Sequence, residues 1–72
     1  MSSIQAILFN RDYFNNKMAN EFMKHNKLVK IKPYHLTNKY IRARLLTPNY
    51  KKYYYRIGTI APHIDVIYQF KN

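Results

Sequence analysis

The chain has 72 residues, of which 13 are Lys or Arg and only three are Asp or Glu, so its formal net charge is +10. This length allows one small domain over residues 1–72, and a domain of this size buries only about 60% of its unfolded surface. The 47% of hydrophobic residues favour a folded core over disorder. Because cysteine is absent, disulfides and thiolate metal sites are excluded. Such a charge imbalance makes a polyanion, nucleic acid above all, the first partner to consider.

The first third of the chain predicts a buried strand and then a helix. Residues 4–9 form a short apolar run with Gln5 as the one polar residue, which is typical of a central strand covered on both faces. Asn15 can cap the helix that follows, and Asn26 is a suitable left-handed residue to stop it. One side of this helix is apolar at the spacing expected for packing on a sheet: Met18, Ala19, Phe22 and Met23.

Residues 40–45 predict a strand whose two faces differ in chemistry. Successive side chains of a strand point to opposite faces, so the apolar residues of this run share the face towards a core. The other face then carries one aromatic ring and two guanidinium groups, which suit an anion. These outward residues are Tyr40, Arg42 and Arg44, and the inward ones are Ile41, Ala43 and Leu45.

Residues 27–34 also alternate, with Lys30 and Lys32 on the polar side, and they predict a second strand. The polar residues 35–38 form a connection of hairpin length to the strand at 40–45. Antiparallel pairing of these two strands would place the two lysines beside the two arginines, giving a basic sheet face made from two strands.

The last third predicts one further strand and one undecided segment. Pro48 marks the exit from the preceding strand, and residues 49–59 fit either a short helical turn or an edge strand. Gly58, the single glycine, is expected at a position that needs a positive φ or close backbone approach. Residues 63–70 alternate clearly and form the last strand. The predicted fold is therefore α+β: a small antiparallel or mixed sheet of about four strands in the order β-α-β-β-β, with one helix packed on one face.

The pattern Asn38-x-Tyr40-x-Arg42-x-Arg44, followed by Pro48 and Tyr50, resembles a family of short basic open reading frames in large DNA viruses. That family is similar in turn to the small N-terminal domain of XkdF-like phage proteins. The resemblance covers nearly the whole chain, although the family usually has Ser or Thr at the helix cap and acidic residues in the first helical turn. It implies a viral origin, and we expect a place in the viral factory or nucleus of an infected host or inside the virion. DNA is expected more than RNA as the polymer, but the sequence leaves both open. It assigns no catalytic residue.

Little in the sequence points to catalysis, a metal or a membrane. Three carboxylates in distant segments do not converge, and one glycine cannot build a phosphate-binding loop, so no enzyme activity is expected. His63-x-Asp65 with His25 or His35 lacks a second supporting spacing, so no metal or cofactor is expected either. There is no signal-peptide pattern, no long basic amphipathic helix and no apolar run of membrane length, so secretion and membrane binding are not expected.

Three acids cannot pair 13 cations, so most of the positive charge must face solvent or a partner. We predict a non-catalytic, sequence-tolerant nucleic-acid-binding protein that contacts phosphates, with Tyr40 and one tyrosine of residues 53–55 stacking on bases and genome packaging as a fitting role. The alternative is a small structural virion or interaction protein that docks an acidic viral protein. A homodimer fits either case. The predicted nucleic-acid-binding residues are Lys30, Lys32, Tyr40, Arg42, Arg44, Lys51, Lys52, Tyr54 and Arg56.

Overall fold

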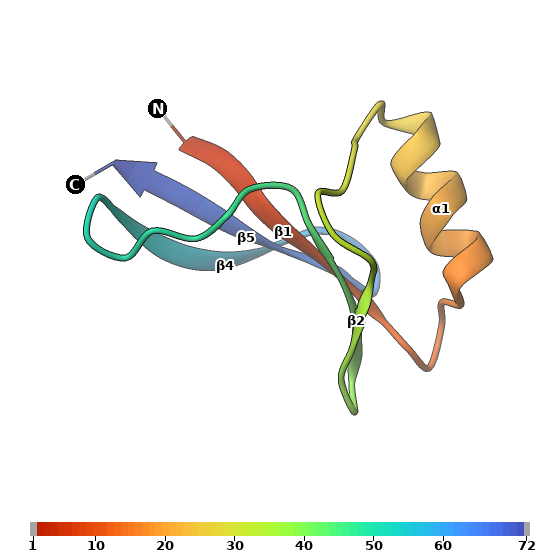
Figure 1. Cartoon of the computed structure of the whole chain (residues 1–72). Helices are drawn as coiled ribbons and strands as arrows, with labels where there is room; N and C mark the ends of the chain where they lie inside the picture. Colours follow the sequence, from red (N-terminus) through yellow and green to blue (C-terminus); the bar gives the residue numbers. More distant parts are fainter. Residues whose placement is uncertain (1, 72) are drawn as a thin grey trace.

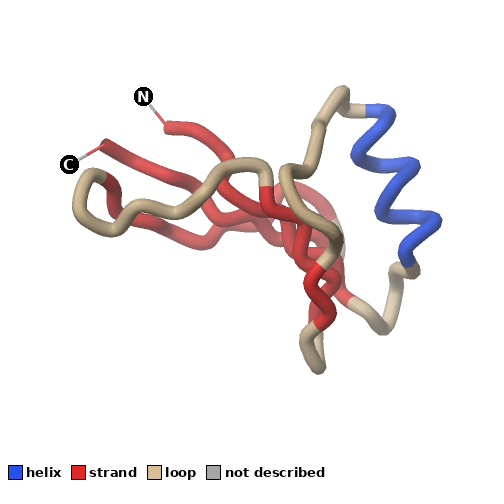
Figure 2. Tube along the Cα trace, viewed as in Figure 1, coloured by secondary structure: helices blue, strands red, loops and turns tan. Residues whose placement is uncertain are grey.

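The structure of the protein, a computed structural model, describes residues 2–71, which form one helix and five strands (Figures 1 and 2). All strand pairs are antiparallel, and the order across the sheet is β2-β3-β1-β5-β4. The predicted α+β fold with a helix on one face is confirmed, as is the central place of the first strand, although the sheet has one strand more than expected. In chain order the elements are β1 (Ser2–Asn10), α1 (Asn16–His25), β2 (His35–Leu36), β3 (Tyr40–Arg44), β4 (Tyr53–Ala61) and β5 (Ile64–Lys71).

The hydrophobic core lies between α1 and the three central strands. Ile7 of β1 pairs with one core residue on each side, and Phe9 does the same two residues later. The Phe9 ring is fully buried and lies 5.3 Å from the Phe14 ring and 5.5 Å from the Phe22 ring, centroid to centroid. Figure 1 shows that α1 lies over one end of the sheet, while β4 and β5 extend beyond it. The buried core residues are Ile7, Phe9, Ala19, Met23, Ile41, Ala43, Ile64 and Val66.

Both ends of α1 were predicted correctly, at Asn15 and Asn26, but the left-handed residue was not. The Asn15 side chain accepts a hydrogen bond of 2.9 Å from the backbone N–H of Met18, so Asn15 is the N-cap. Asn26 is not left-handed, because its φ is −97° and both its backbone N–H and its side-chain amide donate to the Phe22 carbonyl. The left-handed residue is Lys27, with φ of 54°. Its N–H donates to Lys24, and the next N–H donates to the Met23 carbonyl, which closes the helix as a Schellman motif.

The strand predicted at residues 27–34 is wrong, because this segment is irregular and the strand β2 comprises only His35–Leu36. The antiparallel direction of pairing was right: His35 lies opposite Arg42 and Leu36 opposite Ile41. Pro33 has no N–H to donate to a ladder, and the helix closure at Lys27 fixes the direction in which the chain leaves α1. As a result the Val29 side chain, which alternates with the lysines of this segment, is 80% exposed.

The undecided segment at residues 49–59 contributes an edge strand, β4, which pairs with β5 along its length. Residues 45–52 connect β3 to β4 across the two strands between them. Several hydrogen bonds hold this crossing segment. The buried Gln5 amide donates to the Leu46 carbonyl at 2.7 Å, and the N–H groups of Leu45 and Leu46 donate to the Gln5 carbonyl. Further along, the Asn49 N–H donates to the Tyr55 hydroxyl oxygen at 2.7 Å. Gln5 lies at an irregularity in the pairing of β1 with β5, between Ile4 and Ala6.

Gly58 is required by close approach and not by backbone conformation. No glycine has a positive φ, so that half of the prediction is wrong. A Cβ atom at position 58 would lie 2.9 Å from Cε2 of the Tyr68 ring, which is closer than real side chains approach. The Tyr68 ring therefore occupies the space that a side chain on β4 would need.

Replacing Gly58 by Ala should therefore destabilise the fold, because the added methyl group must displace the Tyr68 ring. We expect a loss of about 1–3 kcal/mol in the free energy of unfolding, measured by urea denaturation. The same substitution in a Tyr68→Leu background should cost much less, since the ring is gone. An equal loss in both backgrounds would show that the contact with Tyr68 is not the cause.

Candidate nucleic-acid interface

The register of the sheet separates two faces, one covered by α1 and one not. Arg42 lies opposite Leu8, and Leu8 lies opposite Asp65, so these three side chains point away from the helix. We call this surface the helix-free face. Its strand residues are Ala6, Leu8, Tyr40, Arg42, Arg44, Tyr53, Tyr55, Ile57, Thr59, Asp65, Ile67, Gln69 and Lys71.

Arg42 and Arg44 form an arginine pair on the helix-free face. Both side chains are half-buried, and the Nε atom of each is buried and has no hydrogen-bond partner among residues 2–71. Their neighbours on β1 are Leu8 and Ala6, which are buried although no helix lies on this face. The aliphatic parts of the arginines thus lie beside apolar surface, while their charged ends face outwards. A buried N–H without an acceptor is costly, so each guanidinium gains by turning towards an anion that accepts from Nε and Nη together.

The carboxylate on this face does not neutralise the arginine pair. The Tyr40 hydroxyl donates to one oxygen of Asp65 at 3.0 Å, and the Thr59 hydroxyl donates to the other at 2.7 Å. Leu8 stands between Arg42 and Asp65 in the cross-strand row, which separates their backbones by two strand spacings, about 10 Å. The negative charge is therefore satisfied by two hydroxyl groups, and the positive charge of the arginine pair stays available.

Two predicted binding residues lie on the opposite face. Tyr54 lies opposite Phe70 and stacks on it, with ring centroids 5.2 Å apart and planes 15° apart. The Arg56 guanidinium lies 5.8 Å from the centroid of the Tyr54 ring. Because side chains alternate along β4, Tyr55 and not Tyr54 shares a face with Arg42. The structure thus does not bring all the predicted residues onto one surface.

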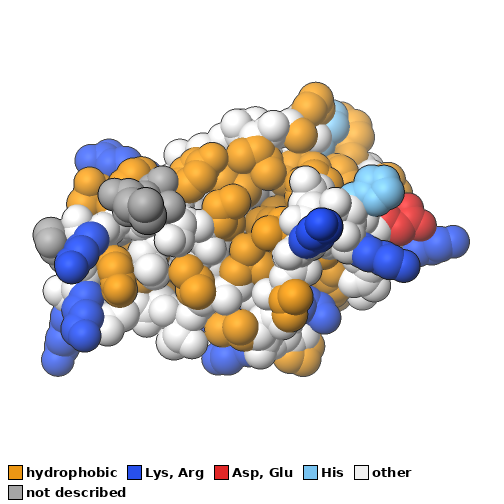
Figure 3. All heavy atoms as spheres, turned by 90° about the horizontal axis from the view of Figure 1, so that it is seen from above, with side chains coloured by type: hydrophobic (Ala, Val, Ile, Leu, Met, Phe, Trp, Pro, Cys, Tyr) orange, Lys and Arg blue, Asp and Glu red, His pale blue; other side chains and the backbone are white. Residues whose placement is uncertain are grey.

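Lys51 and Lys52 lie in the turn that leads into β4. Together with Tyr53 and Lys71 they line a hollow of about 500 Å³. Figure 3 shows Lys and Arg side chains gathered at this end of the molecule, at the left of the view. Lys71 was not among the predicted binding residues, although its outward place in the alternation of residues 63–71 could have identified it.

Tyr50 is a second residue that the prediction missed. Its ring is 75% exposed and meets the Tyr55 ring at 66°, with centroids 5.1 Å apart. The Tyr55 side chain lies on the helix-free face and its hydroxyl donates to Gln69 at 3.1 Å, so Tyr50 is presented beside that face. The isolated aromatic residue after Pro48 was the available signal in the sequence.

Lys30 and Lys32 are exposed, but they do not belong to a strand beside the arginine pair. The Lys30 ammonium lies 4.9 Å from the centroid of the Tyr34 ring. Tyr34 donates to the Asn20 side chain on α1, and burial raises the pKa of the Tyr34 hydroxyl. These contacts hold the irregular segment against the helix and away from the helix-free face.

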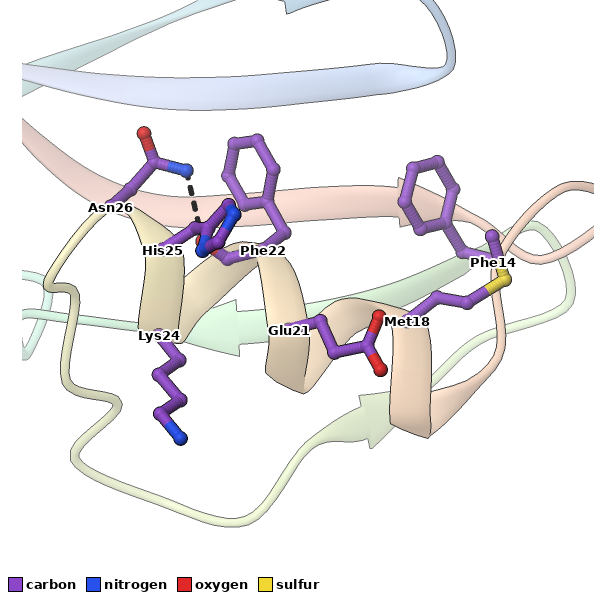
Figure 4. Close-up of a pocket in the computed structure, with 7 residues that line it drawn as sticks. All are labelled: Phe14, Met18, Glu21, Phe22, Lys24, His25 and Asn26. Atoms are coloured by element: carbon purple, nitrogen blue, oxygen red, sulfur yellow. Dashed lines mark hydrogen bonds between the residues drawn. The ribbon is translucent and has the colours of Figure 1, made fainter.

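A separate apolar groove of about 470 Å³ lies along α1 (Figure 4). The Phe14 and Phe22 rings point towards the sheet, whereas Glu21 and Lys24 point away from it. One carboxylate and one imidazole, His25, line the groove. Among residues 2–71 no three His, Asp or Glu side chains gather into a metal site. The one helix of these residues is too short and too polar to cross a membrane.

Comparison with known proteins gave no relative. No family model matches the sequence, and no significant match was found among curated proteins or solved structures. The resemblance to short basic reading frames of DNA viruses and to XkdF-like proteins therefore stays a prediction. The function proposed below is argued from the geometry of the helix-free face.

The hydrogen bond between Tyr40 and Asp65 can be tested by removing one hydroxyl group. Tyr40→Phe should lower the free energy of unfolding by about 1 kcal/mol, because a half-buried carboxylate loses one of its two donors. Denaturant unfolding measures the change. Tyr50→Phe is the matched control, since its exposed ring should tolerate the change without loss. A Tyr40→Phe protein as stable as the wild type would contradict the assigned role of this hydroxyl.

Proposed function

We propose that this protein is a non-catalytic nucleic-acid-binding protein that holds phosphate groups on its helix-free face. The observation that carries the proposal is the arginine pair, whose buried Nε donors have no acceptor and whose nearest carboxylate on this face is engaged elsewhere. Arginine suits this task because its planar guanidinium can donate two parallel hydrogen bonds to one phosphate. Lys51, Lys52 and Lys71 extend the positive surface towards the other end of the face.

Phosphate binding of this kind does not depend on the base sequence of the nucleic acid. The other polar groups of the helix-free face that could read a base edge already have partners: Gln69 accepts from Tyr55, and Asp65 accepts from Tyr40 and Thr59. Arginine and lysine contacts to phosphates fix the position of the polymer without reading its sequence. The exposed Tyr50 ring offers an unpaired base a surface on which to stack.

A viral role extends this proposal through the resemblance noted above. A small basic protein of a DNA virus that binds phosphates without regard to sequence would serve in packaging or protecting the genome, and DNA is then favoured over RNA as the polymer. The net charge of +10 supports association with a polyanion at physiological salt.

An acidic protein is the second candidate partner for the same face. The observation that favours it is Ile57, whose side chain is 65% exposed on the helix-free face, beside Ile67. An exposed apolar centre with cations around it is typical of a protein interface. In this case the protein would be a structural or interaction component of the virion.

Titration with salt separates the two candidates. Labelled duplex and single-stranded DNA should bind at low salt, and the logarithm of the binding constant should fall linearly with the logarithm of salt concentration, by about 0.9 per duplex phosphate neutralised. Replacing both Arg42 and Arg44 by Ala should reduce this slope by about 2 and weaken binding at low salt by at least about tenfold. Fluorescence anisotropy measures both quantities.

The matched control replaces Lys17 and Lys24 by Ala, which removes the same charge from the exposed side of α1. Its slope should equal that of the wild type. If both double variants lose the same affinity, binding depends on total charge and not on the helix-free face. If neither DNA binds at low salt, the nucleic-acid proposal is wrong and an acidic protein is the partner to seek.

A further inference from the structure

The outer edge of β4 is long and, within residues 2–71, pairs with no other strand. β4 has nine residues and forms its ladder with β5, whereas the opposite edge of the sheet is the two-residue strand β2. Proteins usually protect an exposed edge with Pro, Lys or a very short strand. The β2 edge has such protection, from its length and from Pro33 just before it. The β4 edge has neither Pro nor Lys between Tyr53 and Ala61, and its one irregularity, between Thr59 and Ala61, lies at the end of the strand and leaves Tyr53–Thr59 regular.

The β4 edge is also apolar on both faces and poor in charge. Ile57 is exposed on the helix-free face, Tyr54 is exposed on the other face, and Ile60 is exposed near the end of the strand. Of the 13 cations in the chain only Arg56 lies in β4, and the strand contains no acid. Two molecules with a charge of +10 repel each other, so they can approach closely only where cations are scarce. The β4 edge is such a place.

We propose that the β4 edge pairs with the β4 edge of a second copy of this chain, forming an antiparallel two-fold dimer with one continuous sheet. An antiparallel pair of identical strands with two-fold symmetry must be centred on one residue, which then faces itself. Ile57 is the midpoint of Tyr53–Ala61, so centring there pairs the whole strand. It also places Arg56 opposite Gly58 of the second copy.

This register agrees with the side chains on β4. Centring the two-fold on Arg56 would place two guanidinium groups directly opposite each other, which is destabilising. With the centre at Ile57, each guanidinium instead meets a glycine, where no side chain competes for space. The exposed Ile57 side chains of the two copies contact each other on the helix-free face. Centring on Tyr55 or Thr59 would leave part of each strand unpaired.

The dimer has a consequence for the helix-free face, and this consequence alone rests on the proposed function. Residues directly opposite each other in a sheet point to the same face, so the two-fold axis is perpendicular to the sheet. The helix-free faces of both copies then lie on the same side and form one surface with two arginine pairs. Such a surface could follow a longer stretch of nucleic acid than one copy can.

Self-association should respond to salt in the opposite direction from nucleic-acid binding. Salt screens the repulsion between two positively charged copies, so the dimer should become tighter as salt is added. Sedimentation velocity of the protein alone, over a range of protein concentrations at low and high salt, measures this. A protein that stays monomeric up to millimolar concentration at high salt would overturn the proposal.

Two matched substitutions locate the interface. Ile57→Lys adds a charge at the centre of the β4 edge and should give a monomer under conditions where the wild type is dimeric. Leu36→Lys adds the same charge at a side chain that is 50% exposed on the other edge strand, and it should leave the dimer intact. If both variants dissociate equally, or if Ile57→Lys stays dimeric, the interface is not the β4 edge. Circular dichroism verifies that both variants are folded.

The register can be tested with a single thiol, since the chain has no cysteine of its own. Opposite residues of an antiparallel pair have Cα atoms about 4.5–5.5 Å apart, which suits a disulfide. Ile57→Cys, oxidised with diamide, should form a covalent dimer, whereas Leu36→Cys should not. A dimer of the Ile57→Cys protein that does not cross-link would overturn the two-fold at Ile57. No nucleic acid is present in these experiments, so their failure would leave the proposed function standing.

Discussion

The pairing of β1 with both β3 and β5 is the constraint on which the rest of the structure depends. Ile7 and Phe9 point into the core under α1, together with the residues opposite them on β3 and β5. Leu8, which lies between them, must therefore point to the other face. Leu8 therefore brings Arg42 and Asp65 to the helix-free face. A slip of one residue between β1 and β3 would bury both guanidinium groups against α1 and expose Ile41 and Ala43. Burial of the core thus fixes the arginine pair on an open surface.

The helix-free face keeps its positive charge because hydroxyl groups, and not the arginines, bind the carboxylate of Asp65. Asp65 could have neutralised a guanidinium, but the hydroxyls of Tyr40 and Thr59 satisfy it instead. With this acceptor engaged, the Nε donors of Arg42 and Arg44 have no partner within the part of the chain that the structure describes. In the unbound protein, the two buried donors without acceptors raise the free energy of the folded state. Hydrogen bonds to a bound phosphate would offset part of this cost. If the protein binds phosphates as proposed, binding and folding would be coupled through the same two side chains.

Sequence patterns predicted those parts of the fold in which burial alternates regularly. Residues 40–45 and 63–70 have a clear two-residue period, so the faces of Arg42 and of Val66 could be predicted without knowing their neighbours. Residues 27–34 alternate equally well, but Pro33 and the left-handed Lys27 prevent a strand there. The alternation of polar and apolar residues does not reveal either of these backbone constraints. The three consecutive tyrosines at 53–55 have no alternation at all. Only the pairing of Tyr55 with Gln69 decides that Tyr54 and Arg56 lie on the opposite face from the arginine pair.

The most direct test of phosphate binding by the arginine pair is to follow the arginine side chains by NMR. The chain has four arginines, so the Nε–Hε signals of a ¹⁵N-labelled sample can be assigned and followed by NMR while a short DNA duplex is added. The signals of Arg42 and Arg44 should shift and saturate together, because their Nε donors acquire phosphate acceptors, while those of Arg11 and Arg56 change little. Binding of the duplex with the Arg42 and Arg44 signals unchanged would contradict the account.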